Sequence, residues 1–261
     1  MIRNVLPVLL LVNYFAFGQA NNQGKSPSVA DLKATSERGT MLADYDIAAW
    51  HATDAVEALK PDHAAAPMYL AHKVNDKWEV VFGRMSQQGD SFLIVYRATE
   101  GDSPEQFRAT KSEPASEDRG FYLEAARAIG TASKDFGRQT RPYNSYVLPS
   151  ARGELYVYFL PAQTAEGVYP LGGDVRYTVT LDGSTIVEKH QMHTKIIEKK
   201  QSLQPGQTLA GGYHTHVLDN NVEDSDVFHV LSRNPPVPEI VGTPDGHVYE
   251  IETDGSIKRE K

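Results

Sequence analysis

Apolar residues recur at three- and four-residue spacing between Met41 and Leu59, a pattern that predicts a helix over residues 40–59. Pro61 marks its end, because proline has no amide hydrogen with which to continue a helix. The same spacing returns at residues 121–132 and predicts a second helix.

Between these helices, the alternation of apolar and polar residues is typical of β-strands. Three strands are expected, at residues 68–74, 78–85 and 92–98. The turn-forming sequences Asn75-Asp76 and Gln88-Gly89-Asp90 separate them, which predicts an antiparallel meander. Residues 101–119 are polar and charged, and we expect a loop there.

The second half of the chain has more regular strand signals. The apolar run 155–160 predicts a strand that Pro161 ends, and Asp182-Gly183 predicts a hairpin turn because both positions tolerate positive φ. A short helix or turn is expected around Ile196-Ile197, followed by a strand at His214 and a helix over 225–232. The remaining expected strands are residues 174–181, 185–190, 240–243, 248–252 and 256–259.

These patterns together predict an α+β protein. Residues 21–39 are expected to be a linker, and residues 40–119 an N-terminal helix followed by a three-stranded antiparallel meander. Residues 120–261 are expected to form a mixed or antiparallel sheet with flanking helices.

Residues 1–20 have the pattern of a secretory signal peptide. Arg3 supplies positive charge, residues 5–17 are apolar, and Gly18-Gln19-Ala20 is typical of a cleavage site. The mature chain is therefore expected to be exported, either to a periplasm or out of the cell, and to have no membrane attachment after cleavage. An uncleaved membrane anchor is the alternative interpretation.

Composition excludes some binding partners and one kind of covalent cross-link. The formal net charge is -8 and no basic stripe is present, which argues against nucleic acid and anionic membrane as partners. The sequence contains no Cys, so export brings no disulfides, and stability must come from the core or from a metal. Oligomeric state has no sequence signal.

The most specific chemistry lies in Gly211-Gly212-Tyr213-His214-Thr215-His216 and the acidic run that follows. Alternate residues of a strand share a face, so His214 and His216 point the same way. With a carboxylate from the following helix, Asp226 or alternatively Asp219 or Asp224, they can bind a divalent metal and leave one position open for water. The competing interpretation is a polar strand face without a metal.

Other histidines lie close by in the sequence. His190 and His193 have a spacing that shares a face only on a helix, and we expect them to be polar residues at the end of a strand. His229 lies inside the predicted helix, where it could support the metal ligands or remain a partly exposed helix residue.

The chain also resembles a known family, the JAB/JAMM (MPN-type) zinc peptidases, and most of all the bacterial JAB-like domains. The similarity covers roughly residues 120–260 and rests on Tyr213-His214-Thr215-His216, Ser225-Asp226-Val227 and residues 242–249. The resemblance implies zinc bound by His214, His216 and Asp226. It also implies an upstream Glu as general base, which would be Glu154 or alternatively Glu166.

Three features depart from the family pattern. The spacing from His216 to Asp226 is one residue short, Glu223 replaces a serine that supports the oxyanion, and Val217 replaces a proline. Two functions therefore stay open. One is a zinc-dependent hydrolase of peptide or isopeptide bonds, with Glu223 or Ser225 near the oxyanion. The other is a non-catalytic binding or assembly protein with a degenerate JAB-like fold. A structural protein without metal is a third interpretation.

Overall fold

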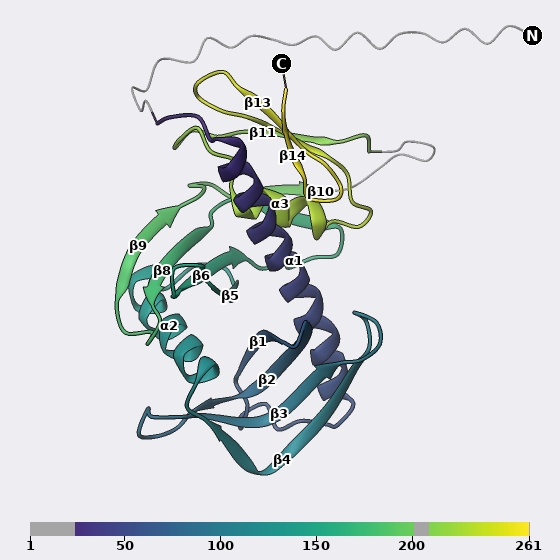
Figure 1. The fold of residues 1–261 in the computed structure, drawn as a ribbon. Coiled ribbons are helices and arrows are strands. Elements are labelled where there is room, and N and C mark those ends of the chain that lie inside the picture. Colours follow the sequence, from purple (N-terminus) through teal and green to yellow (C-terminus); the bar gives the residue numbers. More distant parts are fainter. Residues whose placement is uncertain (1–23, 201–208, 261) are drawn as a thin grey trace, which may run out of the picture.

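The computed structural model describes residues 24–200 and 209–260, so the expected signal peptide at residues 1–20 lies outside the described residues. The described chain forms three helices and fourteen strands, and its class is α+β, as predicted. The long helix α1 (Val29–Glu57) extends from the C-terminal sheet to the N-terminal sheet at the opposite end of the molecule (Figure 1).

Helix α1 begins at Val29, within the segment that the sequence predicted to be a linker. Ser28 caps it reciprocally: its Oγ accepts from the Asp31 amide at 3.2 Å, and the Asp31 carboxylate accepts from the Ser28 amide at 2.9 Å. Helix α3 packs closely against this first part. A Cβ on Gly39 would lie 2.4 Å from the Cβ of Val227, so only glycine permits that approach.

The N-terminal sheet has the order β1-β2-β3-β4 and is antiparallel throughout. Its strands are β1 (Met68–Val74), β2 (Lys77–Met85), β3 (Phe92–Glu100) and β4 (Phe107–Asp118). The meander is therefore four-stranded, and the loop predicted over 101–119 is wrong for the part that forms β4. This strand lies at the sheet edge with most residues exposed, so no hydrophobic alternation announces it.

A second antiparallel sheet, of order β5-β6-β8-β9, packs against α2 (Phe121–Phe136). Its strands are β5 (Tyr143–Pro149), β6 (Glu154–Pro161), β8 (Val175–Thr180) and β9 (Ile186–Gln191). The predicted hairpin turn joins β8 to β9, and Gly183 has φ 73° there. A Cβ at Gly183 would lie 2.5 Å from the Glu124 carbonyl oxygen, so glycine also lets the hairpin approach α2.

One mixed or antiparallel sheet was expected over residues 120–261, but the described strands of this range lie in three sheets. The C-terminal one is mixed, because β11 runs parallel to β12 while β12, β13 and β14 are antiparallel. Its elements are β11 (Gly212–Thr215), β12 (Glu239–Gly242), β13 (Val248–Ile251) and β14 (Ile257–Arg259), with α3 (Asp224–Leu231) in the β11–β12 connection. A two-stranded sheet pairs β7 (Val168–Leu171) with β10 (Ile197–Lys200). Residue 197 therefore begins a strand where the sequence predicted a short helix or turn.

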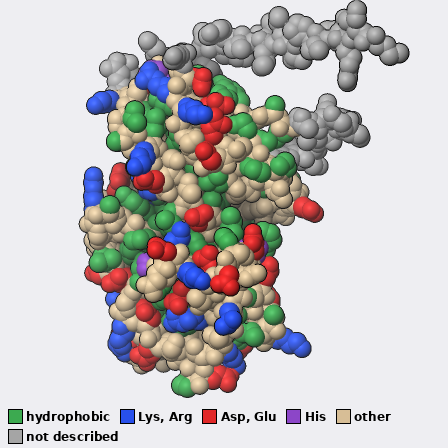
Figure 2. All heavy atoms as spheres, turned by 45° about the vertical axis from the view of Figure 1, so that its right-hand side comes forward, with side chains coloured by type: hydrophobic (Ala, Val, Ile, Leu, Met, Phe, Trp, Pro, Cys, Tyr) green, Lys and Arg blue, Asp and Glu red, His purple; other side chains and the backbone are tan. Residues whose placement is uncertain are grey.

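Helix α1 contacts the N-terminal sheet, strand β5 of the second sheet, and α3 and β14 of the C-terminal part. In the core its Tyr45 hydroxyl accepts from the Ala71 amide at 2.9 Å. No helix among the described residues has both the length and the apolar character needed to cross a membrane. Acidic and basic side chains are interspersed on the face that Figure 2 shows.

Candidate metal centre

Three imidazoles and one carboxylate converge where β9, β11 and α3 meet. They belong to His193, His214, His216 and Asp226, and one ligand atom from each lies within 4.8 Å of the others. His214 is in β11, and His216 follows it by two residues, so both rings point to the same face as the strand pattern predicted. Asp226 is in the first turn of α3, and His193 follows the end of β9.

The separations between these atoms fit a single small cation. The Nε2 atoms of His193 and His214 lie 2.9 and 3.1 Å from Nε2 of His216. The Asp226 oxygens lie 3.3, 3.1 and 3.1 Å from the Nε2 atoms of His193, His214 and His216. A tetrahedral zinc site holds neighbouring ligand atoms about 3.3 Å apart, and these five separations are close to that value.

The other ring nitrogen of each histidine is held from behind. Nδ1 lies 2.8 Å from an Asp174 carboxylate oxygen in His193, 2.9 Å from a Glu239 carboxylate oxygen in His214, and 2.5 Å from the Asn221 carbonyl oxygen in His216. Ionised carboxylates and carbonyls only accept, so each Nδ1 carries a hydrogen, and a ring that gives up its second proton to a bound cation turns a lone pair inward. Three inward lone pairs beside a carboxylate are the arrangement that metal-binding histidines have.

Glu239 is itself fixed in place. Its second carboxylate oxygen accepts from Nη1 of Arg233 at 3.0 Å, and both side chains are buried. Gly212 pairs with Glu239 across the parallel strands, and a Cβ there would lie 1.7 Å from the Glu239 carboxylate. The Gly-Gly sequence before the two histidines thus leaves room for the carboxylate that orients His214.

Asp174 is brought to His193 by a tight turn. Gly172 and Gly173 precede it with φ of 85° and 68°, and a Cβ on Gly172 would lie 2.3 Å from the Lys195 carbonyl oxygen. The turn lets the chain around His193 pass close to Asp174. The Asp174 carbonyl also accepts from the Met192 amide at 3.2 Å, which anchors the segment that carries His193.

The electrostatics favour a positive charge at the centre. Burial by itself would lower the pKa of His193, but Asp174 and Asp226 outweigh it and raise that pKa to about 11. Burial would raise the pKa of Asp226, yet the surrounding histidines hold it well below the usual range. With neutral rings, the carboxylates of Asp174, Asp226 and Glu239 and the guanidinium of Arg233 sum to -3 + 1 = -2, which a divalent cation neutralises.

Four other residues that the sequence placed near the metal, Glu223, Asp224, Ser225 and His229, have different surroundings. Asp224 turns away from the histidines and binds Arg38, Arg176 and the Tyr158 hydroxyl. Glu223 is the buried N-cap of α3 and lies 2.9 Å from His190 Nε2. Ser225 donates to the Met192 sulfur at 3.7 Å. His229 lies on the next turn of α3, where it lines a pocket.

Neither candidate for the general base joins the cluster. Glu154 opens β6 and pairs with Thr180. Phe159, five residues further along β6, pairs with Val175 next to Asp174, so Glu154 lies about 17 Å along the strand from that position. Glu166 is exposed in the turn that leads to β7.

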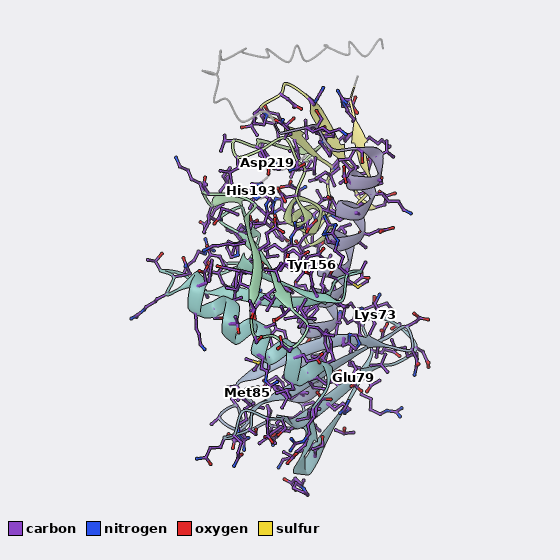
Figure 3. All side chains as sticks on the ribbon, turned by 60° about the vertical axis from the view of Figure 1, so that its left-hand side comes forward. Lys73, Glu79, Met85, Tyr156, His193 and Asp219 are labelled. Atoms are coloured by element: carbon purple, nitrogen blue, oxygen red, sulfur yellow. The ribbon has the colours of Figure 1, made fainter. Side chains whose placement is uncertain are left out.

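His193 is the ligand candidate that sequence reasoning set aside. The strand interpretation placed its ring out of line with the others, but β9 ends at Gln191 and the chain turns towards Asp174. The sequence signal that could have identified His193 as a ligand candidate was the clustering of histidines, five of which fall between positions 190 and 229. Figure 3 shows His193 at the junction between the β5–β9 sheet and the C-terminal sheet.

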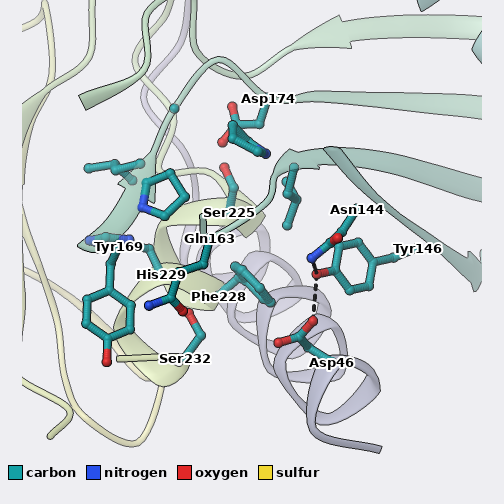
Figure 4. A pocket seen from close by; sticks show the side chains of 15 residues that line it. Asp46, Asn144, Tyr146, Gln163, Tyr169, Asp174, Ser225, Phe228, His229 and Ser232 are labelled. Atoms are coloured by element: carbon teal, nitrogen blue, oxygen red, sulfur yellow. Dashed lines mark hydrogen bonds between the residues drawn. The ribbon is translucent and has the colours of Figure 1, made fainter. Parts of the chain in front are cut away.

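Two pockets bear on this region, one through shared residues and one through Arg38. One, of about 90 Å³, shares Asp174 and Ser225 with the surroundings of the cluster, and in it Asp46 accepts from the Tyr146 hydroxyl at 2.7 Å (Figure 4). The other, of about 330 Å³, is mostly apolar and lies between α1, β1, β2 and the β5–β6 hairpin. Arg38 lines the larger pocket and also binds Asp224 of α3.

No protein-family model matches the chain, and neither a curated protein nor a solved structure shows significant similarity to it. The resemblance to JAB/JAMM peptidases therefore rests on the motif residues themselves. Independently of any family, the buried cluster of three histidines and Asp226 is compatible with a metal ion.

Proposed function

We propose that this chain is an exported zinc-binding protein in which a closed four-ligand site holds α3 and the C-terminal sheet in place for a non-catalytic binding function. The observation that carries the proposal is the position of His193, which supplies a fourth ligand beside His214, His216 and Asp226. Structural zinc sites have four protein ligands, whereas catalytic sites have three and an open position for water.

The chemistry of the donors favours zinc. Three imidazole nitrogens and one carboxylate oxygen at tetrahedral separations suit zinc better than calcium or magnesium, which prefer oxygen ligands. Burial is nearly complete, with side-chain exposures of 4%, 3% and 0% for His214, His216 and Asp226. Export is supported by residues 1–20, and the lack of Cys leaves a metal as the means of cross-linking the chain.

The pocket of about 330 Å³ supports the binding part of the proposal, because small-molecule sites usually have volumes of roughly 300–1,000 Å³ and largely apolar walls. Arg38 connects that pocket to α3 through Asp224, and α3 carries the ligand Asp226. The metal would thus fix the position of α3, and α3 in turn holds Arg38 in the wall of the pocket.

A zinc-dependent hydrolase of peptide or isopeptide bonds, acting on a peptide or protein substrate, is the second candidate. It is favoured by His193, whose side chain at 11% is the most exposed of the four, so that its displacement would free a coordination position. Zinc would supply a bound water of lowered pKa there. The distance of Glu154 from the cluster weighs against this candidate, because a general base must lie within hydrogen-bonding reach of that water.

Metal content and hydrolysis measured on the same samples test the proposal. We expect one tightly bound zinc per chain in the wild type, tighter binding than in His193→Ala, and no cleavage of peptide or isopeptide substrates by either. Loss of zinc from a folded His214→Ala variant would show that the zinc is bound by the cluster of three histidines and Asp226. Wild-type chain without zinc after reconstitution would overturn the proposal, and cleavage that depends on His214 would replace it with the hydrolase.

A further inference from the structure

A second group of ligand-type side chains lies next to the first. His190, Asp219 and Glu223 offer one nitrogen and two carboxylate oxygens, all within 4.8 Å of one another. His190 Nε2 lies 2.9 and 3.0 Å from the two Glu223 oxygens, separations that two ligands of one metal ion also have.

The two groups are interleaved along the chain. His190 precedes His193 by three residues, and Glu223 precedes Asp226 by three. The Glu223 amide donates to the second Asp226 oxygen at 2.8 Å, and the Asp219 carboxylate accepts from the Asn221 amide at 2.9 Å. Because the Asn221 carbonyl holds His216, the backbone that positions the first group also positions the second.

Charge and burial distinguish this group from an ordinary surface cluster. The Glu223 side chain is only 5% exposed, so it is a carboxylate removed from water. Arg176, which interacts electrostatically with Glu223 and His190, binds Asp224 through Nη1 at 2.5 Å. Two carboxylates with one imidazole thus have an excess of negative charge that a divalent cation would neutralise.

We propose that His190, Asp219 and Glu223 form a second site for a divalent first-row metal ion, more open and weaker than the first. The His190 side chain is 22% exposed and Asp219 is half-buried, so water can complete the coordination. One nitrogen and two oxygen donors suit Zn²⁺ or Mn²⁺. Three protein ligands with open positions are the arrangement of catalytic metal sites, so this site has the free coordination that the first one lacks.

Calorimetric titration of the metal-stripped full-length mature chain with Zn²⁺ tests this inference, and Mn²⁺ titration followed by electron paramagnetic resonance serves as a second probe. We expect two Zn²⁺ ions per wild-type chain, bound in a tight and a weaker step. Asp219→Asn and His190→Gln should each lose the weaker step and keep the tight one. His214→Ala should lose the tight step.

His247→Gln is the matched control, because His247 also lies 2.8 Å from a carboxylate, Asp245, but belongs to neither group of ligand-type residues. It should keep both steps. A single step that His214→Ala abolishes would overturn the second site while leaving the proposed function intact. A weaker step that persists in both Asp219→Asn and His190→Gln would also overturn it, and circular dichroism would establish that these variants are folded.

Discussion

Nδ1 of His214 lies 2.9 Å from Oε1 of Glu239, and this contact turns the opposite nitrogen of the ring towards Asp226. The two residues are on parallel neighbouring strands, β11 and β12. The orientation of one candidate ligand therefore depends on a buried carboxylate that is distant in sequence and is not among the four groups of the cluster.

Replacing that carboxylate should weaken metal binding without removing a ligand. Glu239→Gln keeps an acceptor for His214 but loses the charge that supports the ring and balances Arg233. We expect zinc affinity to fall roughly 10- to 100-fold. Competition with a chromophoric chelator measures it, and Glu188→Gln, an exposed change on β9, should bind as the wild type does. Equal affinities in the two variants would contradict the role of Glu239.

Gly212→Ala should destabilise the fold and weaken the metal site together. The new methyl group would lie 1.7 Å from the Glu239 carboxylate, which Arg233 and His214 hold in place. A cost of about 1–3 kcal/mol is expected for overpacking at such a position. Denaturant unfolding measures it. The control, Gly130→Ala, has no heavy atom within 4 Å of the added Cβ and lies inside α2, where it should be neutral or stabilising.

Asp224→Asn should reduce stability but leave zinc in place. The carboxylate is buried between Arg38 and Arg176, at 2.8 and 2.5 Å, so its neutralisation leaves two cations without a counter-charge. Loss of one partner in such a buried group costs about 3 kcal/mol. Urea unfolding should register this loss, and Asp54→Asn, an exposed change on α1, should not. Zinc-free but folded Asp224→Asn protein would mean that Asp224 is a ligand after all.

Removal of the metal should lower thermal stability, because an ion bound only by the folded chain stabilises it by mass action. At a free zinc concentration near 1,000 times Kd the contribution is about 4 kcal/mol. A chelator should therefore lower the melting temperature of the wild type. The chain has no cysteine, so no disulfide could replace the metal as a cross-link between β9, β11 and α3. The His214→Ala variant should melt at a low temperature with or without chelator, and an equal chelator effect on both proteins would argue against the site.

Much of the fold could be predicted from the chain alone. The strands β2, β3 and β6 and the β8–β9 hairpin have strong apolar runs or turn residues, and their prediction needed no tertiary information. The start of α1 and the edge strand β4 could not be found in this way. Their residues are mainly polar or exposed, and they are held by neighbours, as Gly39 is by α3 and β4 is by β3.

The sequence by itself determined that His214 and His216 face the same way, because alternation along a strand is a local property of the backbone. It also determined that an acidic residue opening the next helix is near enough to join them. Only the tertiary structure decided that the carboxylate is Asp226 rather than Asp224, because the rotation of α3 is set by Arg38 and Arg176. It also added His193 as a fourth candidate ligand, since the turn at Gly172-Gly173 brings Asp174 and the end of β9 together across the fold. A ligand placed by such long-range contacts has no signature in local spacing.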